Sequence, residues 1–463
     1  MADNKVLILD GTQAEDENRP AILAALTDVL QSSGGEIRAL TLREMKIAHC
    51  QGCFGCWIET PGTCKQADAG REIAKAVVHS DTLVLFTPVT FGGYSPELKR
   101  AVDRFIQLAV PYFRVEHGEL HHPPRYVPVA RLLVVGVQRH PNEEEARVFR
   151  TLAGRNAINM HPGSYAAEVI GSEDDIATLR QRFQAMLSRS DALPFGEAVT
   201  SLTPAPDASL IDVRREGRCR ALLLVGSPKV RPTGGSTAAG KIPSTSGVLG
   251  NYLLERLQLD GWETESLTIR ASVLRPDGQA ELLSATDRAD LILLAFPLYV
   301  DALPSLVTKA LEVIATHRRA LANPLPQRLA VVVNNGFPEA HQNTVALAIC
   351  HQFAAQSRIA WAGGLALGAG EAISSGRPLI ALDRSGPRVN HVIRALDLTA
   401  AALAEGHPVP GEAVTLIARN PMPLVPFTVW RSIFVKAGGR GMERLAAENG
   451  VNKDELLARP YAA

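Results

Sequence analysis

Four of the six cysteines in this chain of 463 residues lie between positions 50 and 64. They are Cys50, Cys53, Cys56 and Cys64, in the stretch "HCQGCFGCWIETPGTC". Thiolates bind soft metals and iron–sulfur clusters, and they also carry out redox chemistry. In a reducing compartment, this crowding favours metal binding or redox chemistry over structural disulfides.

The spacing of these cysteines suits a cluster of several iron atoms. Three cysteines separated by two residues can bind three corners of a cubane, and Cys64 can bind the fourth iron. Gly52, Gly55 and Gly62 allow the backbone to approach sulfur closely and to adopt positive φ angles. The sequence therefore predicts a [4Fe-4S] cluster held by all four cysteines. Structural zinc sites more often use two pairs with a longer spacer, but zinc and a metal-free loop remain the alternatives.

The composition is that of a folded globular protein with two or three domains. Hydrophobic residues make up 46% and charged residues 21% of the chain,. The 48 Lys and Arg residues balance the 48 Asp and Glu residues, and without a basic stripe we expect no nucleic-acid partner. No apolar run is long enough to span a bilayer and the start resembles no signal peptide, so we expect no membrane partner and a cytoplasmic location.

Short apolar, β-branched runs alternate with helical patterns twice along the chain. This pattern predicts two doubly wound parallel sheets, each with five strands and with helices on both faces. The expected strands lie at 6–9, 37–42, 83–86, 132–137 and 164–170, and then at 221–226, 263–269, 291–296, 328–334 and 358–367.

The order of elements in the second half repeats that of the first, which predicts a tandem duplication. In both halves a proline (Pro88, Pro297) is followed by Ser and, four residues on, by Lys, giving the pairs Ser95/Lys99 and Ser305/Lys309. A stretch rich in Pro, Ser and Thr separates the halves. The predicted divisions are domain 1–192, linker 193–217, domain 218–405 and a C-terminal extension, 406–463, that packs on the domains as a lid or a buried cover.

The cysteine motif followed by "TPVTFGGYSPELKRAVDRF" resembles the iron-sulfur flavoproteins, a branch of the flavodoxin-like NAD(P)H-dependent FMN reductases. In the second half, "GSPK", "FPLYVDALPSLVTKALE" and "NNGFPE" resemble the three flavin-binding loops of the same family. The resemblance implies two flavodoxin-like domains, bound FMN and redox activity, but no particular substrate.

Ligands of open α/β sheets bind beyond the carboxyl ends of the strands, where the winding reverses. Hydroxyls, cations and a helix start in the first loop of the second half suit a phosphate, and the other two loops suit the isoalloxazine ring. A flexible Ser/Gly surface loop is the alternative for the first loop. The predicted FMN-binding residues are Ser227, Lys229, Ser244, Thr245, Ser246, Pro297, Leu298, Tyr299, Val300, Asn334, Asn335, Gly336 and Phe337.

The corresponding phosphate loop of the first half is acidic. Glu15, Asp16 and Glu17 would repel a phosphate, and Arg19 does not cancel them,. We therefore expect that each half keeps one cofactor, with the cluster in the first and FMN in the second. The alternative is that the first half also binds FMN, through Thr12, Gln13 and "TPVTFGGY", with the acids turned to solvent.

Together these features predict an FMN-dependent oxidoreductase that takes electrons from NAD(P)H, or from its cluster, and reduces a small organic acceptor. The alternative is a non-catalytic electron carrier or redox sensor between protein partners, which the neutral charge does not favour. No catalytic residue can be assigned. The two halves are expected to pack face to face as a pseudo-dimer within one chain, and a further homodimer stays open.

Two smaller features have plainer interpretations. His117, His121 and His122 have no carboxylate or cysteine beside them that would complete a metal site, so we expect a surface loop there,. Cys219 and Cys350 stand alone and are expected to be small, buried apolar residues,.

Overall fold

The computed structural model describes residues 4–16, 18–207, 219–227, 244–373, 379, 389–421 and 425–462. By their internal contacts they form two units, one of Met1–Ala198 with Val435–Ala463 and one of Val199–Phe434. The first unit thus contains the end of the chain as well as its beginning. The predicted domain boundaries stay predictions.

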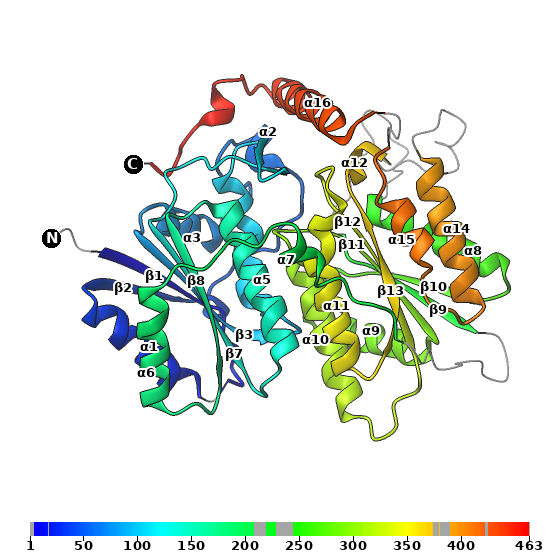
Figure 1. Cartoon of the computed structure of the whole chain (residues 1–463), viewed down its shortest axis with the longest axis horizontal. Coiled ribbons are helices and arrows are strands. Elements are labelled where there is room, and N and C mark those ends of the chain that lie inside the picture. Colours follow the sequence, from blue (N-terminus) through cyan, green and yellow to red (C-terminus); the bar gives the residue numbers. More distant parts are fainter. Residues whose placement is uncertain are drawn as a thin grey trace. The chain divides into compact units, whose positions relative to one another are not determined.

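The first unit is built on a parallel sheet with the strand order β2-β1-β3-β7-β8 (Figure 1). A short strand, β4, pairs antiparallel with β3, and β5 and β6 form a separate hairpin. The strands are β1 Asn4–Asp10, β2 Gly35–Thr41, β3 Thr82–Thr90, β4 Gly93–Tyr94, β5 Arg114–Glu116, β6 Glu119–His121, β7 Arg131–Gln138 and β8 Ser164–Gly171. The helices are α1 Arg19–Ser32, α2 Gly55–Ile58, α3 Ala69–Val78, α4 Pro96–Val102, α5 Glu143–Met160, α6 Ile176–Ser188 and α7 Glu197–Thr200.

Apolar side chains of α1 and α6 cover one face of this sheet. Leu26 of α1 and Phe183 of α6 share a buried cluster with Ile8, Val84 and Leu133 of the central strands. Side-chain caps fix where several helices begin, because a carboxylate, hydroxyl or amide oxygen accepts one of the free N–H groups of the first turn. The capping residues are Asp68 for α3, Ser95 for α4, Asn142 for α5 and Asp175 for α6.

The second unit is built on a parallel sheet with the order β10-β9-β11-β12-β13. Its strands are β9 Arg220–Val225, β10 Glu263–Thr268, β11 Leu291–Pro297, β12 Arg328–Asn334 and β13 Ala360–Leu367. Its helices include α8 Thr245–Leu259, α9 Pro276–Arg288, α10 Ser305–Ala320, α11 Thr344–Gln356, α12 Gly370–Ile373, α14 Asn390–Ala404 and α15 Gly411–Ile417. The last long helix, α16 Phe427–Glu448, begins in this unit and ends in the first.

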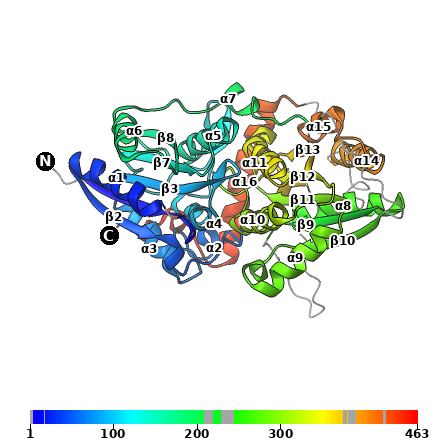
Figure 2. The same ribbon diagram turned by 90° about the horizontal axis from the view of Figure 1, so that it is seen from below.

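The core of the second unit lies between its sheet and helices α8, α14 and α15. Leu253, Leu396 and Ile417 of these helices pack with Leu223 and Leu293 of the strands. Helices α10 and α11 lie on the opposite face of the sheet (Figure 2).

Both sheets have the same connectivity, with the second strand outside the first and the later strands on its other side. The winding therefore reverses between the first and third strands, as in flavodoxin-like folds, and the predicted fold class is confirmed. Each third strand is also followed by the same tight turn, three residues after its proline. Phe91 and Gly92 have φ angles of 56° and 82°, and Val300 and Asp301 have 45° and 59°.

This turn aligns the two units and corrects one detail of the predicted repeat. Ser95 is the N-cap of α4 and corresponds to Pro304, the N-cap of α10. The expected pairing of Ser95 with Ser305 is therefore wrong by one residue. The duplication itself stays a prediction.

The larger elements without a counterpart in the sequence prediction include the β5–β6 hairpin, α9 and α16. Among the described residues, no helix combines the length and the apolar character needed to cross a membrane.

Candidate functional site

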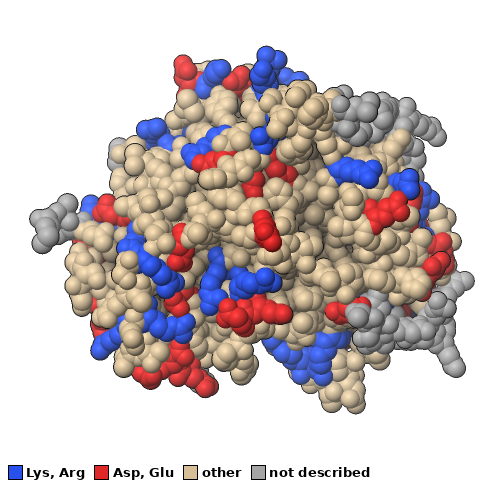
Figure 3. All heavy atoms as spheres, viewed as in Figure 1, with Lys and Arg blue, Asp and Glu red and all other residues tan. Residues whose placement is uncertain are grey.

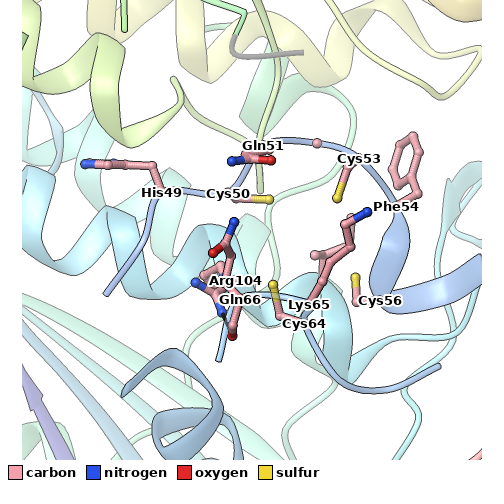
Figure 4. A pocket seen from close by; sticks show the side chains of 12 residues that line it. His49, Cys50, Gln51, Cys53, Phe54, Cys56, Cys64, Lys65, Gln66 and Arg104 are labelled. Atoms are coloured by element: carbon pink, nitrogen blue, oxygen red, sulfur yellow. Dashed lines mark hydrogen bonds between the residues drawn. The ribbon is translucent and has the colours of Figure 1, made fainter. Parts of the chain in front are cut away.

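The four clustered cysteines line one pocket in the first unit. Their sulfur atoms face into the same space (Figure 4). Cys56 is buried, Cys50 and Cys64 are partly buried, and Cys53 is exposed. The residues around the pocket are His49, Cys50, Gln51, Gly52, Cys53, Phe54, Cys56, Cys64, Lys65, Gln66, Arg104 and Ile106.

Left-handed backbone conformations shape the loop around the pocket. Gly52 and Gly62 have φ angles of 60° and 80°, and Phe54, just before α2, has 55°. The Gly62 N–H donates to the Cys56 carbonyl at 2.9 Å, which folds the chain back after the third cysteine. The predicted use of glycine is thus confirmed at Gly52 and Gly62. Gly55 instead lies in α2, where a Cβ would meet the Lys65 side chain at 2.5 Å.

A buried ion pair fixes both ends of the loop. The Arg104 guanidinium binds the Asp68 carboxylate through two hydrogen bonds of 3.0 Å. Arg104 also donates to the carbonyls of Ala48 (2.9 Å) and Gln66 (3.4 Å), and Asp68 accepts the Ala48 N–H at 2.7 Å. The pair therefore ties the segment before Cys50 to the segment after Cys64.

The electrostatics of this pair favour the charged carboxylate. Burial raises the pKa of Asp68, but the hydrogen bonds from Arg104 and from the N–H groups of Ala48 and Gly70 outweigh it and hold the pKa below its usual value,. Asp68 thus caps α3 and anchors the cysteine loop as a carboxylate at neutral pH.

Trp57 anchors the middle of the loop next to Cys56. Its indole N–H is shared between the carbonyls of Ile106 (3.1 Å) and Ala109 (3.0 Å). The ring stacks on Phe54, with centroids 5.2 Å apart, and contacts the His122 ring at 4.6 Å. Packing on this scale limits the freedom of a short helix such as α2.

The histidines near this site are structural. Burial lowers the pKa of His122 to about 4, so its ring is neutral, and Nδ1 lies 2.7 Å from the Tyr112 carbonyl. His121 is fully buried, and its Nδ1 lies 3.0 Å from Oδ1 of Asn159. The expected surface loop is therefore right for the exposed His117 and wrong for His121, which the β5–β6 hairpin carries into the core.

The thiols are poor anions in the absence of a positive centre. Burial raises the pKa of Cys50 to about 12 and also raises that of Cys56, and the neighbouring thiolates add to both effects. Ionising all four would place like charges around one pocket. A positively charged iron–sulfur core resolves this, because it binds the thiolates directly. The donor set therefore fits such a core.

The thiols surround the pocket and do not converge on a single point. Within the described parts of the chain, no three His, Cys, Asp or Glu side chains come together closely enough to hold one metal ion.

Several residues at this site were missed by sequence reasoning. Arg104, Gln107 and Lys65 surround the cysteines: Gln107 accepts the Cys64 N–H at 3.0 Å, and Lys65 pairs with Glu59 at 2.8 Å. The signal for Arg104 was within reach, because it lies in the "KRAVDRF" stretch that follows the third strand.

The predicted flavin residues of the second unit lie at the carboxyl edge of its sheet. Ser227 is buried just after β9, and Ser244 caps α8 by accepting the Gly247 N–H at 3.1 Å. The Ser246 hydroxyl donates to Oδ1 of Asn334 at 2.7 Å, and the Thr245 hydroxyl donates to the Gly370 carbonyl at 3.4 Å. Ser246 thus links the start of α8 to the end of β12, and Thr245 links it to the segment after β13. Lys229 lies outside the described residues.

The third loop forms a strained turn at the same edge. Tyr299 and Ala302 exchange backbone hydrogen bonds of 2.9 and 3.1 Å across Val300 and Asp301. Positive φ is rare for a β-branched residue such as Val300, and strain of this kind gathers at binding sites. The Leu298 N–H donates to the Asn334 carbonyl at 2.8 Å, so β11 leads into this turn beside the fourth loop. Pro297 ends β11 just before it.

The fourth loop presents a buried amide and an open glycine. Asn335 donates from Nδ2 to the Glu339 carbonyl at 3.0 Å, while its Oδ1 is buried and has no hydrogen-bond partner among the described residues. Gly336 has open space where a Cβ would lie, and Phe337 is partly exposed. These predicted residues lie at one sheet edge, and their role in binding FMN stays a prediction.

In the first unit, the corresponding phosphate loop satisfies its own donors. The Asp16 carboxylate accepts the Gln13 N–H at 2.8 Å, where a phosphate oxygen would be expected to bind. Asp10 accepts the N–H and hydroxyl of Thr12 at 3.0 and 2.5 Å, and the Ser95 hydroxyl donates to the Gly11 carbonyl at 2.5 Å. Glu15 is exposed and Glu17 lies outside the described residues.

Comparison with known proteins gives one matching family model and several relatives. Residues 4–170 match the family model of NADPH-dependent FMN reductase. An iron-sulfur flavoprotein of Methanocaldococcus jannaschii is 29% identical over 108 residues, which are 23% of this chain and 55% of that protein. One from Archaeoglobus fulgidus is 29% identical over 96 residues, or 21% of this chain and 43% of that protein. The chain thus spans about half the length of these relatives.

Among solved structures, an NAD(P)H:quinone oxidoreductase from Methanothermobacter marburgensis is similar over 40% of this chain and 98% of that structure. The identity is 16% and the TM-score 0.33, too low to support an argument about function. The sequence matches, with the strand order and the four-cysteine pocket, agree with the predicted resemblance. Residues 4–170 are thus similar to the NADPH-dependent FMN reductase family, and the curated relatives that the chain resembles are iron-sulfur flavoproteins.

Proposed function

We propose that this protein is an FMN-dependent oxidoreductase in which the first unit holds a [4Fe-4S] cluster and the second binds FMN. NAD(P)H is the proposed reductant and a small organic molecule the acceptor. One observation carries the proposal: four thiols face one pocket within residues 4–170, which match the FMN reductase family model, and the chain has relatives named iron-sulfur flavoproteins.

The cofactors would supply the electron chemistry, since FMN exchanges two electrons with hydride donors and single electrons with a cluster. The residues of this chain position them. Arg104 and Asp68 hold both ends of the cysteine loop, and Trp57 packs behind Cys56. In the second unit, the turn at Val300 and the amide of Asn335 lie where the ring is expected to bind.

Assignment of FMN to the second unit rests on the contrast between the two phosphate loops. In the first unit Asp16 already accepts the Gln13 N–H, and its negative charge opposes a phosphate dianion,. In the second unit Ser227 and the N-cap Ser244 flank the corresponding loop. The predicted face-to-face pairing of the units as an internal pseudo-dimer remains a proposal, as does a further homodimer.

An electron carrier or redox sensor is the second candidate. Carriers commonly rely on a strongly signed face for fast encounter with a protein partner. On the face that Figure 3 shows, basic and acidic side chains are interspersed, and the formal net charge is zero. The enzyme is therefore the better-supported proposal.

The test is anaerobic mixing of the purified protein with NADH or NADPH, followed by addition of 2-methyl-1,4-naphthoquinone. We expect bleaching of the flavin absorbance by one of the nicotinamides and repeated turnover when the quinone is added. A protein that dithionite reduces, but that neither nicotinamide reduces, would instead indicate a carrier.

A matched pair of serines tests which unit binds FMN. Ser246→Ala removes a buried hydrogen bond between two loops of the second unit, and Ser95→Ala removes one in the first. We expect Ser246→Ala to raise the Kd for FMN about tenfold, equivalent to about 1.4 kcal/mol. Ser95→Ala should leave this Kd unchanged. Titration of flavin-free protein with FMN measures both, and the reverse pattern would place the flavin in the first unit.

A further inference from the structure

Arg125 is a buried cation without an acidic partner. Arg125 is only 1% exposed. All of its hydrogen bonds go to backbone carbonyls: those of Gln107 (3.1 Å), Leu456 (2.8 Å), Ala458 (2.7 Å) and Ala109 (3.2 Å). Among the described residues, no carboxylate forms an ion pair with it. A buried guanidinium without a counter-charge is unfavourable, so an anion close to it would stabilise the folded protein.

Three other charges near the cysteines are already paired, and Arg71, which donates to the Cys64 carbonyl, is only partly buried. Arg104 acts on Cys50 and Cys64, Lys65 acts on Cys53 and Cys64, and Asp103 acts on Cys50. Their partners are Asp68 at 3.0 Å, Glu59 at 2.8 Å and Lys99, respectively. Each of these pairs is neutral overall, so its net effect on the thiols is small.

The hydrogen bonds of Arg125 connect it to the cysteine site. Gln107, whose carbonyl accepts from Arg125, also accepts the Cys64 N–H through its side chain. The Ala109 carbonyl accepts from both Arg125 and Trp57, the neighbour of Cys56 in the chain. Arg125 and Cys56 act on each other electrostatically, and in each case the charge of one favours the charged form of the other. A cluster with four thiolates has a net negative charge, because the thiolates outnumber the positive charge of its core. Such a centre would be the missing counter-charge of Arg125.

The end of the chain holds Arg125 in this place. Two of its acceptors, the carbonyls of Leu456 and Ala458, belong to the C-terminal segment. In the same segment, the Tyr461 hydroxyl donates to Oε1 of Gln107 at 3.2 Å, the oxygen that also accepts the Cys64 N–H. Pro460 packs so closely on Gly62 that a Cβ there would lie 2.6 Å from its Cδ.

We propose that Arg125 is the buried counter-cation of the four-cysteine centre, and that residues 456–461 are a built-in part of this site that fixes the guanidinium behind Cys56. Arg125 is a positioning residue and does not ligate iron. The inference rests on the proposed cluster and adds a role for a residue and a segment outside the cysteine motif. A neighbouring positive charge stabilises the more negative, reduced state of a cluster, so Arg125 is expected to make the centre easier to reduce.

The direct test compares Arg125→Gln with Arg125→Lys in the full-length, iron-loaded protein. We expect Arg125→Gln to lower the equilibrium constant for one-electron reduction of the cluster at least tenfold. This change corresponds to a midpoint potential that is about 59 mV more negative, or further. Arg125→Lys keeps the positive charge, so its midpoint potential should stay close to that of the wild type. Arg131→Gln is the matched control, because Arg131 also donates to carbonyls, those of Met186 and Arg189, and should leave the potential unchanged.

A second measurement separates charge from hydrogen bonding. In the loaded protein, Arg125→Lys should unfold at a higher temperature than Arg125→Gln, and this advantage should disappear in the metal-free, reduced protein. An equal advantage in both forms would overturn the proposal, as would an unchanged potential in a loaded Arg125→Gln variant. A wild type without iron and sulfide would overturn the proposed function and the counter-cation together, so the two failures are distinguishable.

Discussion

Cys53→Ala is expected to lower the iron and sulfide content of the anaerobically purified protein at least tenfold, while the FMN content stays at the wild-type level. Cys53 is the exposed member of the four cysteines, so its replacement costs little folding energy,. Loss of one thiolate leaves an iron atom of the cluster without its protein ligand. FMN should stay because its proposed residues belong to the other unit. Iron, sulfide and flavin analyses measure the outcome.

Cys219→Ala is the matched control for this experiment. Cys219 is partly buried and lies next to β9 in the second unit, whereas the four-cysteine motif belongs to the first. The Cys219→Ala substitution should leave the iron, sulfide and FMN contents unchanged. If Cys53→Ala kept its full iron and sulfide, the four-cysteine cage would be refuted. If it lost FMN together with iron, the proposed independence of the two sites would be wrong.

Arg104→Met is expected to destabilise the cysteine loop by about 3–5 kcal/mol, the usual effect of removing one member of a buried ion pair. The side chains of Arg104 and Asp68 are only 2% and 16% exposed. The substitution leaves a partly buried carboxylate without its cation and removes the donors to Ala48 and Gln66. Hydrogen exchange in residues 46–66 should accelerate on the order of a hundredfold or more, and the iron content should fall.

An exposed pair in the same unit provides the comparison for Arg104. Arg38 and Glu72 lie 2.8 Å apart, but their side chains are 55% and 57% exposed. Arg38→Met should therefore change the free energy of unfolding by less than about 1 kcal/mol. Similar small effects of both substitutions would show that the Arg104–Asp68 pair does not hold the loop.

The fold could be predicted from the sequence because its signals are local. Runs such as "VLIL" and "LVLF" are buried on both faces of a parallel sheet and therefore read as continuous apolar segments,. The β5–β6 hairpin escaped prediction because its strands are short, and the strand bearing His121 is buried by the fold around it. The polar residues of that segment suggested that it is exposed to solvent, but tertiary packing buries part of it.

The cysteine pocket was predictable for the same reason, since its ligands lie in one short motif. The residues that support it were not. Asp68 pairs with Arg104 across 36 positions, and Arg125 binds the carbonyl of Leu456 across 331. Nothing in the local pattern of either arginine indicates a distant partner. Backbone carbonyls in particular leave no trace in the sequence.

The acidic residues of the first phosphate loop show what charge alone can and cannot predict about a binding site. Their sign predicted a poor phosphate site, but not that Asp16 would take the Gln13 N–H for itself. That detail depends on the path of the loop between β1 and α1.

The measurement that tests the central claim most directly is the cofactor content of the wild-type protein purified without oxygen. Ultraviolet–visible spectroscopy, combined with iron, sulfide, zinc and flavin analysis, gives the number of each per chain. The account predicts one FMN with the iron and sulfide of one [4Fe-4S] cluster, and no zinc. Flavin without iron or sulfide, or two flavins per chain, would contradict it.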